Sequence, residues 1–134
     1  MRLLVHDFSG HPFQAQLSRS LAGRGNQVVH ASCSDYVSGQ GSLTRRPGDP
    51  DGLAFESISL GSDFEKHRYI RRLVQEVVYA WHLIQLIRKV RPEVFVSCNE
   101  PLLTKALVGT YCRVKRQAWV YWLQDLYSEA MTHE

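Results

Sequence analysis

The chain has 134 residues, enough for one compact domain with a hydrophobic core, and residues 1–134 are predicted to form a single domain. Hydrophobic residues make up 44% and charged residues 22%, a composition that excludes an intrinsically disordered protein. The formal net charge of +3 is too small to favour a nucleic-acid partner. The three cysteines form no C-x-x-C pair, so we expect reduced thiols and no metal site.

The first part of the chain follows a strand, helix, strand order. A short apolar strand, 2–5, leads into a turn-rich loop, and Pro12 suits the first turn of a helix. Gly25 is predicted to end that helix, and a second strand, 28–31, follows it. Helical spacing places three apolar residues on one face: Phe13, Leu17 and Leu21. This order predicts a parallel crossover.

A long loop, 32–52, separates this unit from the rest. It is rich in Ser, Gly, Pro and Asp, and a loop of this length in a compact domain is usually functional. An edge strand, 53–60, and a long amphipathic helix, 63–91, are predicted next. The apolar residues of this helix recur every three or four positions: Ile70, Leu73, Val74, Val77, Trp81, Ile84 and Ile87.

The last elements are a buried strand, 94–96, a helix that opens at Pro101, and a final strand, 118–123. The predicted apolar row of this helix is Leu103, Leu107 and Tyr111. Strands alternate with helices along the whole chain. The sequence therefore predicts a doubly wound α/β fold, with a mainly parallel sheet of about five strands and helices on both faces.

Ligands bind such a sheet beyond the carboxyl ends of its strands, so polar residues just after a strand are the candidates for a site. They form three clusters: Asp7, Gly10 and His11; Asn99 and Glu100; and Gln124, Asp125 and Tyr127. A glycine lets a ligand approach the backbone, and free amides at the start of the next helix favour a phosphate. The same glycine equally suits a plain tight turn.

Each candidate in these clusters has two interpretations. Asp7 and Asp125 suit proton abstraction from a hydroxyl nucleophile, and Asp7 equally suits hydrogen bonds to its own loop. His11 is either a neutral hydrogen-bonding group of the site or a helix cap. Glu100 either binds a substrate hydroxyl or favours the helix start. No dinucleotide fingerprint and no phosphate-loop motif is present.

Two further patterns leave a functional alternative open. The aromatic residues near the end of the chain suit stacking on sugars, although Trp119 and Tyr121 occupy alternate strand positions that are normally core. The basic residues of helix 63–91 indicate either a solvated face or contact with an anionic membrane, because they flank an apolar stripe with Trp81. Neither a signal peptide nor a membrane span is predicted. We expect a cytoplasmic chain, and peripheral contact at the inner face of the membrane through this helix is the alternative to a solvated face.

Four stretches carry a family pattern: GHPFQAQL at 10–17, LAGRGNQV at 21–28, RRPGDP at 45–50 and WLQDLYS at 122–128. Together they resemble the amino-terminal, Rossmann-like domain of family 4 glycosyltransferases with the GT-B fold, of the colanic-acid and exopolysaccharide type. The resemblance implies a hexosyltransferase that moves a sugar from a nucleotide-diphosphate donor to a saccharide or lipid-linked acceptor. It also implies no metal and no cofactor besides the nucleotide sugar, and it favours retention of configuration.

The family's site residues carry over position by position. Gly10 and His11 match the loop that approaches the donor diphosphate, and Asn99, Glu100, Gln124 and Tyr127 are placed along the acceptor cleft. Two positions depart from the family, which has histidine where this chain has Asn99 and often where it has Gln124. The donor-binding carboxy-terminal domain has no counterpart in the sequence. We therefore expect the chain alone to be inactive and to need such a domain or subunit.

Two other classes of protein fit the same predicted fold. One is a non-catalytic Rossmann-like module that binds a partner protein or an anionic membrane through helix 63–91. The other is a flavodoxin-like binder of a small molecule, which would carry a chromophore.

Overall fold

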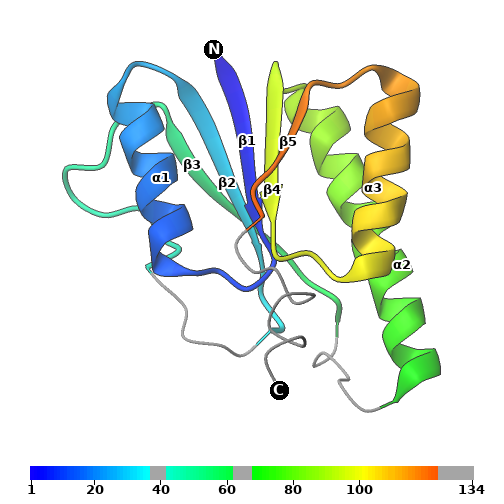
Figure 1. Cartoon of the computed structure of the whole chain (residues 1–134). Helices are drawn as coiled ribbons and strands as arrows, with labels where there is room; N and C mark the ends of the chain where they lie inside the picture. The colour runs from blue at the N-terminus through cyan, green and yellow to red at the C-terminus, as the bar shows by residue number, and fades with distance from the viewer. Residues whose placement is uncertain (37–41, 62–67, 124–134) are drawn as a thin grey trace, which may run out of the picture.

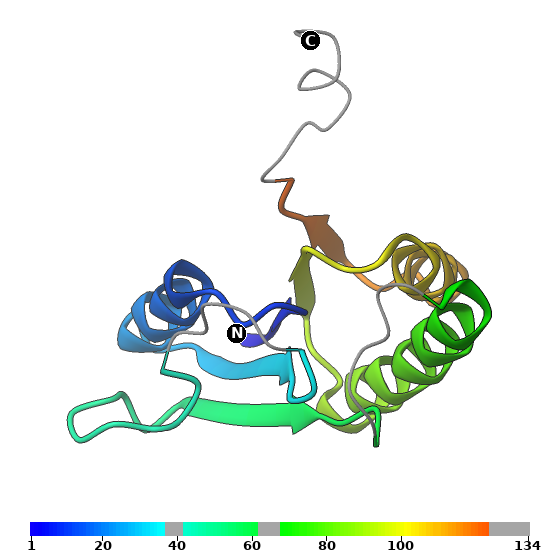
Figure 2. The same cartoon turned by 90° about the horizontal axis from the view of Figure 1, so that it is seen from below.

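The computed structural model describes residues 1–36, 42–61 and 68–123. Within them strands and helices alternate: β1 (Arg2–Asp7), α1 (Pro12–Gly23), β2 (Gln27–Cys33), β3 (Leu53–Ile58), α2 (Tyr69–Val90), β4 (Val94–Cys98), α3 (Leu102–Lys115) and β5 (Trp119–Tyr121). The strands form one all-parallel, five-stranded sheet in the order β3-β2-β1-β4-β5. Helix α1 covers one face, and α2 and α3 lie side by side on the other (Figures 1 and 2). The predicted doubly wound, Rossmann-like α/β fold is confirmed.

The order of the strands reverses at the centre of this sheet. From β1 the chain moves outward to β2 and β3, then crosses to β4 on the other side of β1 and continues to β5. The helix after β1 and the helix after β4 therefore lie on opposite faces (Figure 2). Such a switch point opens a crevice at the carboxyl ends of the two central strands.

The first two strands are longer than predicted. β1 extends through His6 and Asp7, which were expected in the following loop, and β2 extends to Cys33, so the long loop begins at residue 34. In β1, Asp7 pairs in register with Ser32 on one side and Cys98 on the other. Polar residues occur in this central strand because their side chains find hydrogen-bond partners inside the protein.

The ends of the later elements also differ from prediction, since β3 ends at Ile58 and β4 extends to Cys98. Residues 63–67 of the predicted long helix lie outside the described part of the chain, and Arg68 has extended backbone angles, so α2 begins at Tyr69. The final strand covers Trp119–Tyr121 only. Its edge position leaves one side of a three-residue strand without a described neighbour.

Helices α1 and α3 each bury a row that lies one residue after the predicted apolar row. The predicted Phe13 and Leu107 are 42% and 37% exposed. The row that α1 buries is Gln14, Ala15, Ser18 and Ala22, and α3 buries Thr104, Val108 and Cys112. Both buried rows consist mainly of small side chains, which let a helix approach the sheet closely, whereas the larger residues lie at the flanks of the contact.

In α2 the predicted apolar row is mostly on the surface. The helix packs on the sheet through Tyr79, Ala80, Leu83, Leu86 and Ile87, which join Leu4 of β1 and Phe95 of β4 in the larger core cluster. Of the predicted row, Ile87 is buried and Ile84 packs against that cluster. The other five residues are 47–81% exposed: Ile70, Leu73, Val74, Val77 and Trp81. The helix therefore has two apolar faces, and only one of them is core.

The core has one layer on each face of the sheet. The larger layer lies under α2 and α3, and the smaller, under α1, contains Leu3, Val5, Ala22, Val28 and Leu53. Cys33, Cys98 and Cys112 are buried free thiols, and burial raises the pKa of each thiol. For Cys33 and Cys112 the value is about 11, so these thiols are not nucleophiles at neutral pH.

Gly109 marks a close contact between α3 and β5. A Cβ atom at this position would lie 2.8 Å from the Cη2 and Cζ3 atoms of the Trp119 ring. Alanine usually stabilises a helix by about 1 kcal/mol relative to glycine. Here we expect Gly109→Ala to lower the free energy of unfolding by about 1–3 kcal/mol, because the added methyl overpacks the contact.

Urea unfolding measures this effect of Gly109→Ala. In a Trp119→Val background, which removes the ring, the same substitution is expected to be neutral or stabilising. A stabilised Gly109→Ala variant of the otherwise unchanged chain would contradict the contact.

The described part of the long loop is tied to α1 by Arg19. Its guanidinium donates to both carboxylate oxygens of Asp49, at 2.8 and 3.3 Å, and to the carbonyl oxygens of Ser42 and Thr44. The hydrogen bond from Arg19 holds the pKa of Asp49 below its usual value.

Within the described residues, none of the three helices has the length and apolarity that a membrane span requires.

Candidate functional site

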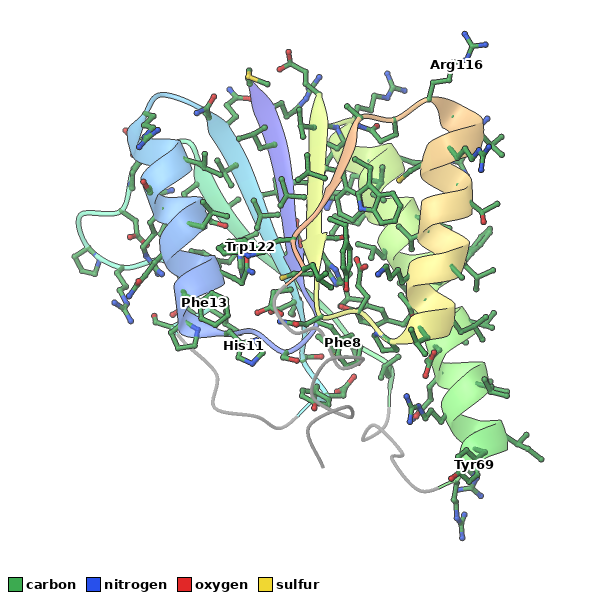
Figure 3. All side chains as sticks on the ribbon, viewed as in Figure 1. Phe8, His11, Phe13, Tyr69, Arg116 and Trp122 are labelled. Atoms are coloured by element: carbon green, nitrogen blue, oxygen red, sulfur yellow. The ribbon has the colours of Figure 1, made fainter. Side chains whose placement is uncertain are left out.

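A cleft of about 1190 Å³ lies at the carboxyl edge of the sheet, at the switch point between β1 and β4. It is lined by residues that follow β1, β2, β4 and β5, by the starts of α1, α2 and α3, and by the end of β5: Phe8, Ser9, His11, Phe13, Tyr36, Arg72, Asn99, Glu100, Pro101, Leu102, Lys105, Tyr121, Trp122 and Leu123. Figure 3 shows His11 and Phe13 side by side at this end of the sheet. Two of the three predicted clusters therefore meet here.

Asp7 holds the loop between β1 and α1. Its side chain is fully buried, and its carboxylate accepts hydrogen bonds from the backbone amides of Ser9 and His11 and from the Asn99 side-chain amide. These contacts match the loop-holding interpretation of Asp7. A carboxylate that is enclosed and hydrogen-bonded in this way does not face a hydroxyl group in the cleft.

His11 and Asn99 connect the two central loops directly. The Asn99 amide nitrogen lies 3.2 Å from His11 Nδ1, which is also 3.3 Å from the Asp7 carboxylate. The His11 side chain is 34% exposed, and its ring stacks on Phe13 with centroids 5.3 Å apart. Asn99 has a left-handed φ of 54°, a conformation that asparagine adopts more readily than most residues. An imidazole and a side-chain amide thus stand together on the cleft wall.

Gly10 makes the tight turn before α1. Its φ of 74° lies in the left-handed region that glycine adopts without strain, and its amide donates to the Asp7 carbonyl. Helix α1 begins at Pro12 with no acidic residue in its first turn, which leaves the positive end of the helix facing the turn. The Asp7 carboxylate already accepts the His11 amide proton, so an anion near this turn would use other donors.

Glu100 lies beneath the cleft in a buried hydrogen-bonded chain. Its carboxylate is 3.0 Å from His6 Nδ1 and accepts from the Ser97 hydroxyl, which accepts in turn from Trp119 Nε1. The other ring nitrogen of His6, Nε2, is 2.8 Å from the Tyr79 hydroxyl. Because both side chains of the His6–Glu100 pair are 0% exposed, Glu100 shapes the cleft floor and its carboxylate is not presented to a substrate hydroxyl.

The donors and acceptors of this hydrogen-bonded network determine which ring nitrogen of His6 carries the proton. A carboxylate can only accept, so we place the proton on Nδ1, which leaves Nε2 as the acceptor for Tyr79. Burial raises the pKa of Tyr79 well above its usual value, which keeps its hydroxyl protonated and able to donate. Each of the polar side chains in this hydrogen-bonded network then has a partner.

Two basic residues of the cleft were not predicted from the sequence. Arg72 Nε donates to Glu76 at 2.8 Å, and Glu76 in turn accepts from the Leu103 amide at the start of α3. Lys105 Nζ lies 3.5 Å from the centre of the Tyr121 ring. The spacing of Arg72 and Glu76 at i and i+4 was the available signal, but nothing in the sequence places this pair beside α3.

The aromatic residues divide between core and cleft. Trp119 packs against the larger core, as predicted, whereas Tyr121 lines the cleft, so its core assignment was wrong. Phe13, predicted on the buried face of α1, instead contacts Trp122 in an edge-to-face pair with centroids 6.1 Å apart. Aromatic rings thus line the cleft beside its polar groups.

The third predicted cluster, Gln124, Asp125 and Tyr127, lies outside the described residues. Trp122 and Leu123, the last two described residues, both line the cleft. Residues 1–36, 42–61 and 68–123 hold no group of three or more histidine, cysteine or acidic side chains arranged to bind a metal.

Comparison with solved structures gives likenesses to proteins of known fold, whereas the sequence comparisons give none. No protein-family model matches the chain, and no curated protein matches its sequence. A crystal structure of UDP-galactose 4-epimerase is similar to it, with 13% sequence identity and a TM-score of 0.46 over 89% of this chain and 54% of that chain. The chain therefore spans about half the length of the epimerase chain. The fold assignment rests on the sheet order, and the glycosyltransferase resemblance stays a prediction.

Proposed function

We propose that residues 1–134 form the acceptor-side domain of a glycosyltransferase active site. The reaction would move a sugar from a nucleotide-diphosphate donor to a saccharide or lipid-linked acceptor in cell-surface polysaccharide synthesis. The observation that carries the proposal is the cleft at the switch point, where His11 and Asn99 come within hydrogen-bond distance from opposite central loops. The sequence resemblance to family 4 supplies the class of reaction.

The chemistry of the cleft walls supports a sugar ligand. The Phe13, Tyr121 and Trp122 rings offer flat apolar surfaces for the faces of a sugar ring, and His11 and Asn99 offer hydrogen bonds to its hydroxyls. Binding sites for small molecules typically combine such apolar walls with a few polar groups, in volumes of about 300–1,000 Å³. The cleft, at about 1190 Å³, has room for more than one sugar.

The residues would divide the work as follows. Gly10 and His11 lie nearest the donor diphosphate, and Arg72 and Lys105 supply positive charge in the same cleft. Asn99 contacts the acceptor, together with Gln124 and Tyr127 outside the described residues. Because the Asp7 carboxylate is held by the loop, Asp125 is the better candidate for the base that accepts the acceptor's proton. A carboxy-terminal donor-binding domain or subunit completes the site.

Ligand-observed NMR with UDP-glucose as the probe tests the proposal. We expect weak binding to the chain, at least tenfold weaker binding to His11→Ala/Asn99→Gly, and unchanged binding to the surface control Arg24→Ala. Glycine at 99 keeps the left-handed backbone free of strain, so that variant should fold. Equal affinity of the double variant, or transfer of glucose to a saccharide by the chain alone, would contradict the acceptor-side assignment.

A further inference from the structure

Helix α2 has an apolar surface, its outer face, that turns away from the sheet. Six of its large apolar residues are 38–81% exposed: Ile70, Leu73, Val74, Val77, Val78 and Trp81. At 3.6 residues per turn they fall within an arc of about 140°. Tyr69, at the start of the helix, lies where α2 projects beyond the sheet (Figure 3). Clustered exposure of this kind marks a contact surface.

The charges of α2 and its neighbour α3 are strongly one-sided. The two helices hold seven Lys and Arg residues and one acidic residue, whereas the rest of the chain holds nine basic and twelve acidic residues. The acidic residue, Glu76, is 3% exposed and is paired with Arg72. Exposed basic residues, among them Arg88 and Arg113, therefore face no exposed carboxylate of their own layer. The modest net charge of the whole chain conceals this basic layer.

We propose that the layer formed by α2 and α3 docks on an anionic lipid bilayer. The outer face of α2 would enter the boundary between headgroups and acyl chains, and the exposed basic residues would contact lipid phosphates. Charge complementarity selects this occupant, because the apolar row with Trp81 lies beside basic residues on two helices whose one acidic residue, Glu76, is buried; among these basic residues, Lys89 also pairs with Glu56 of β3. Helix α2 is not apolar enough to span the bilayer, so it would lie on it.

Docking in this orientation would bring the cleft close to the membrane. Arg72 of α2 and Leu102 of α3 line the cleft and belong to the same two helices, and Leu102 is 81% exposed. A lipid-linked acceptor would then reach the cleft from the bilayer surface. The docking itself does not depend on the proposed function, since it rests on the outer face and the basic layer alone.

Co-sedimentation with lipid vesicles tests the docking. We expect the full chain to bind vesicles of phosphatidylcholine with 30% phosphatidylglycerol, and to bind pure phosphatidylcholine at least tenfold more weakly. Raising the salt concentration from 0.05 to 0.5 M should weaken binding, because electrostatic attraction to the lipid is screened.

Two pairs of substitutions separate the apolar and charged contributions. Ile70→Ser/Trp81→Ser and Arg88→Gln/Arg113→Gln are each expected to weaken binding at least tenfold, at about 1 kcal/mol for each basic residue lost. The control Arg24→Gln/Arg45→Gln removes the same charge from outside the two helices and should bind within twofold of the original chain.

Three results would overturn the proposal. The first is that the full chain does not bind anionic vesicles. The second is that the control pair loses as much vesicle binding as the Arg88→Gln/Arg113→Gln pair. The third is that the chain does not bind vesicles but self-associates in sedimentation velocity, and that Ile70→Ser/Trp81→Ser abolishes the self-association. The last result would assign the outer face to a second copy of the chain.

Discussion

Glu100→Ala is expected to lower the free energy of unfolding by about 3–5 kcal/mol, because it removes one partner from a buried, fully hydrogen-bonded chain. The Nδ1–H of His6 and the hydroxyl of Ser97 would both lose their acceptor where water does not reach. Urea unfolding followed by circular dichroism measures the loss. A loss of this size would leave a domain of ordinary stability only marginally folded.

Conservative substitutions in the same hydrogen-bonded network keep this prediction testable if Glu100→Ala does not fold. Glu100→Gln retains an acceptor for His6, so we expect a smaller loss of about 1–2 kcal/mol. Tyr79→Phe removes the donor to His6 Nε2 and should also cost about 1–2 kcal/mol. If the free energies of unfolding of all three variants lie within 0.5 kcal/mol of the value for the unsubstituted protein, the hydrogen-bonded network around Glu100 is contradicted.

Stability is expected to fall by about 3 kcal/mol between pH 7 and pH 4 because of His30 alone. This side chain is fully buried under α1, where its Nδ1 lies 2.8 Å from the Ser18 hydroxyl. Desolvation by burial lowers its pKa from 6.5 to about 4. Between these values the unfolded chain binds a proton that the folded chain does not, so acid favours unfolding. Below pH 4 both states are protonated and this contribution stops changing.

The measurement is urea unfolding of the original chain and of His30→Gln at pH 7, 5.5 and 4. Glutamine does not titrate, so the difference between the two chains isolates the histidine from the carboxylates that also titrate in this range. We expect the difference in unfolding free energy to shrink steadily toward pH 4. A difference that stays constant with pH would show that His30 titrates normally.

The order and type of the elements could be predicted because the apolar runs and helical periods alternate clearly along the chain. Their packing could not. Phe13 and Leu107 are more apolar than Gln14 and Thr104, yet the latter face the sheet, because close helix packing selects for size and fit. In α2 the two apolar faces together give a single amphipathic pattern in the sequence. Which of the two faces is buried depends on how the helix packs against the sheet, and the sequence of the helix does not show this.

The candidate site was predictable in position but not in detail. Topology places Asp7, His11 and Asn99 at one sheet edge, and residues that follow strands in the sequence indicate this. The roles of Asp7 and Glu100 depend on partners more than 90 residues away in the sequence, which are Asn99 for Asp7 and His6 for Glu100. Local sequence carries no signal for such contacts.

The most direct test of the central claim is a map of backbone amide shifts in the ¹H–¹⁵N NMR spectrum during titration with UDP-glucose. If the cleft between β1 and β4 is the binding site, the largest shifts fall on Gly10, His11, Asn99 and Lys105, with Tyr121 affected as well. Shifts concentrated at the amino edge of the sheet, around Arg24 and Arg116, or no shifts at saturating probe, would contradict it.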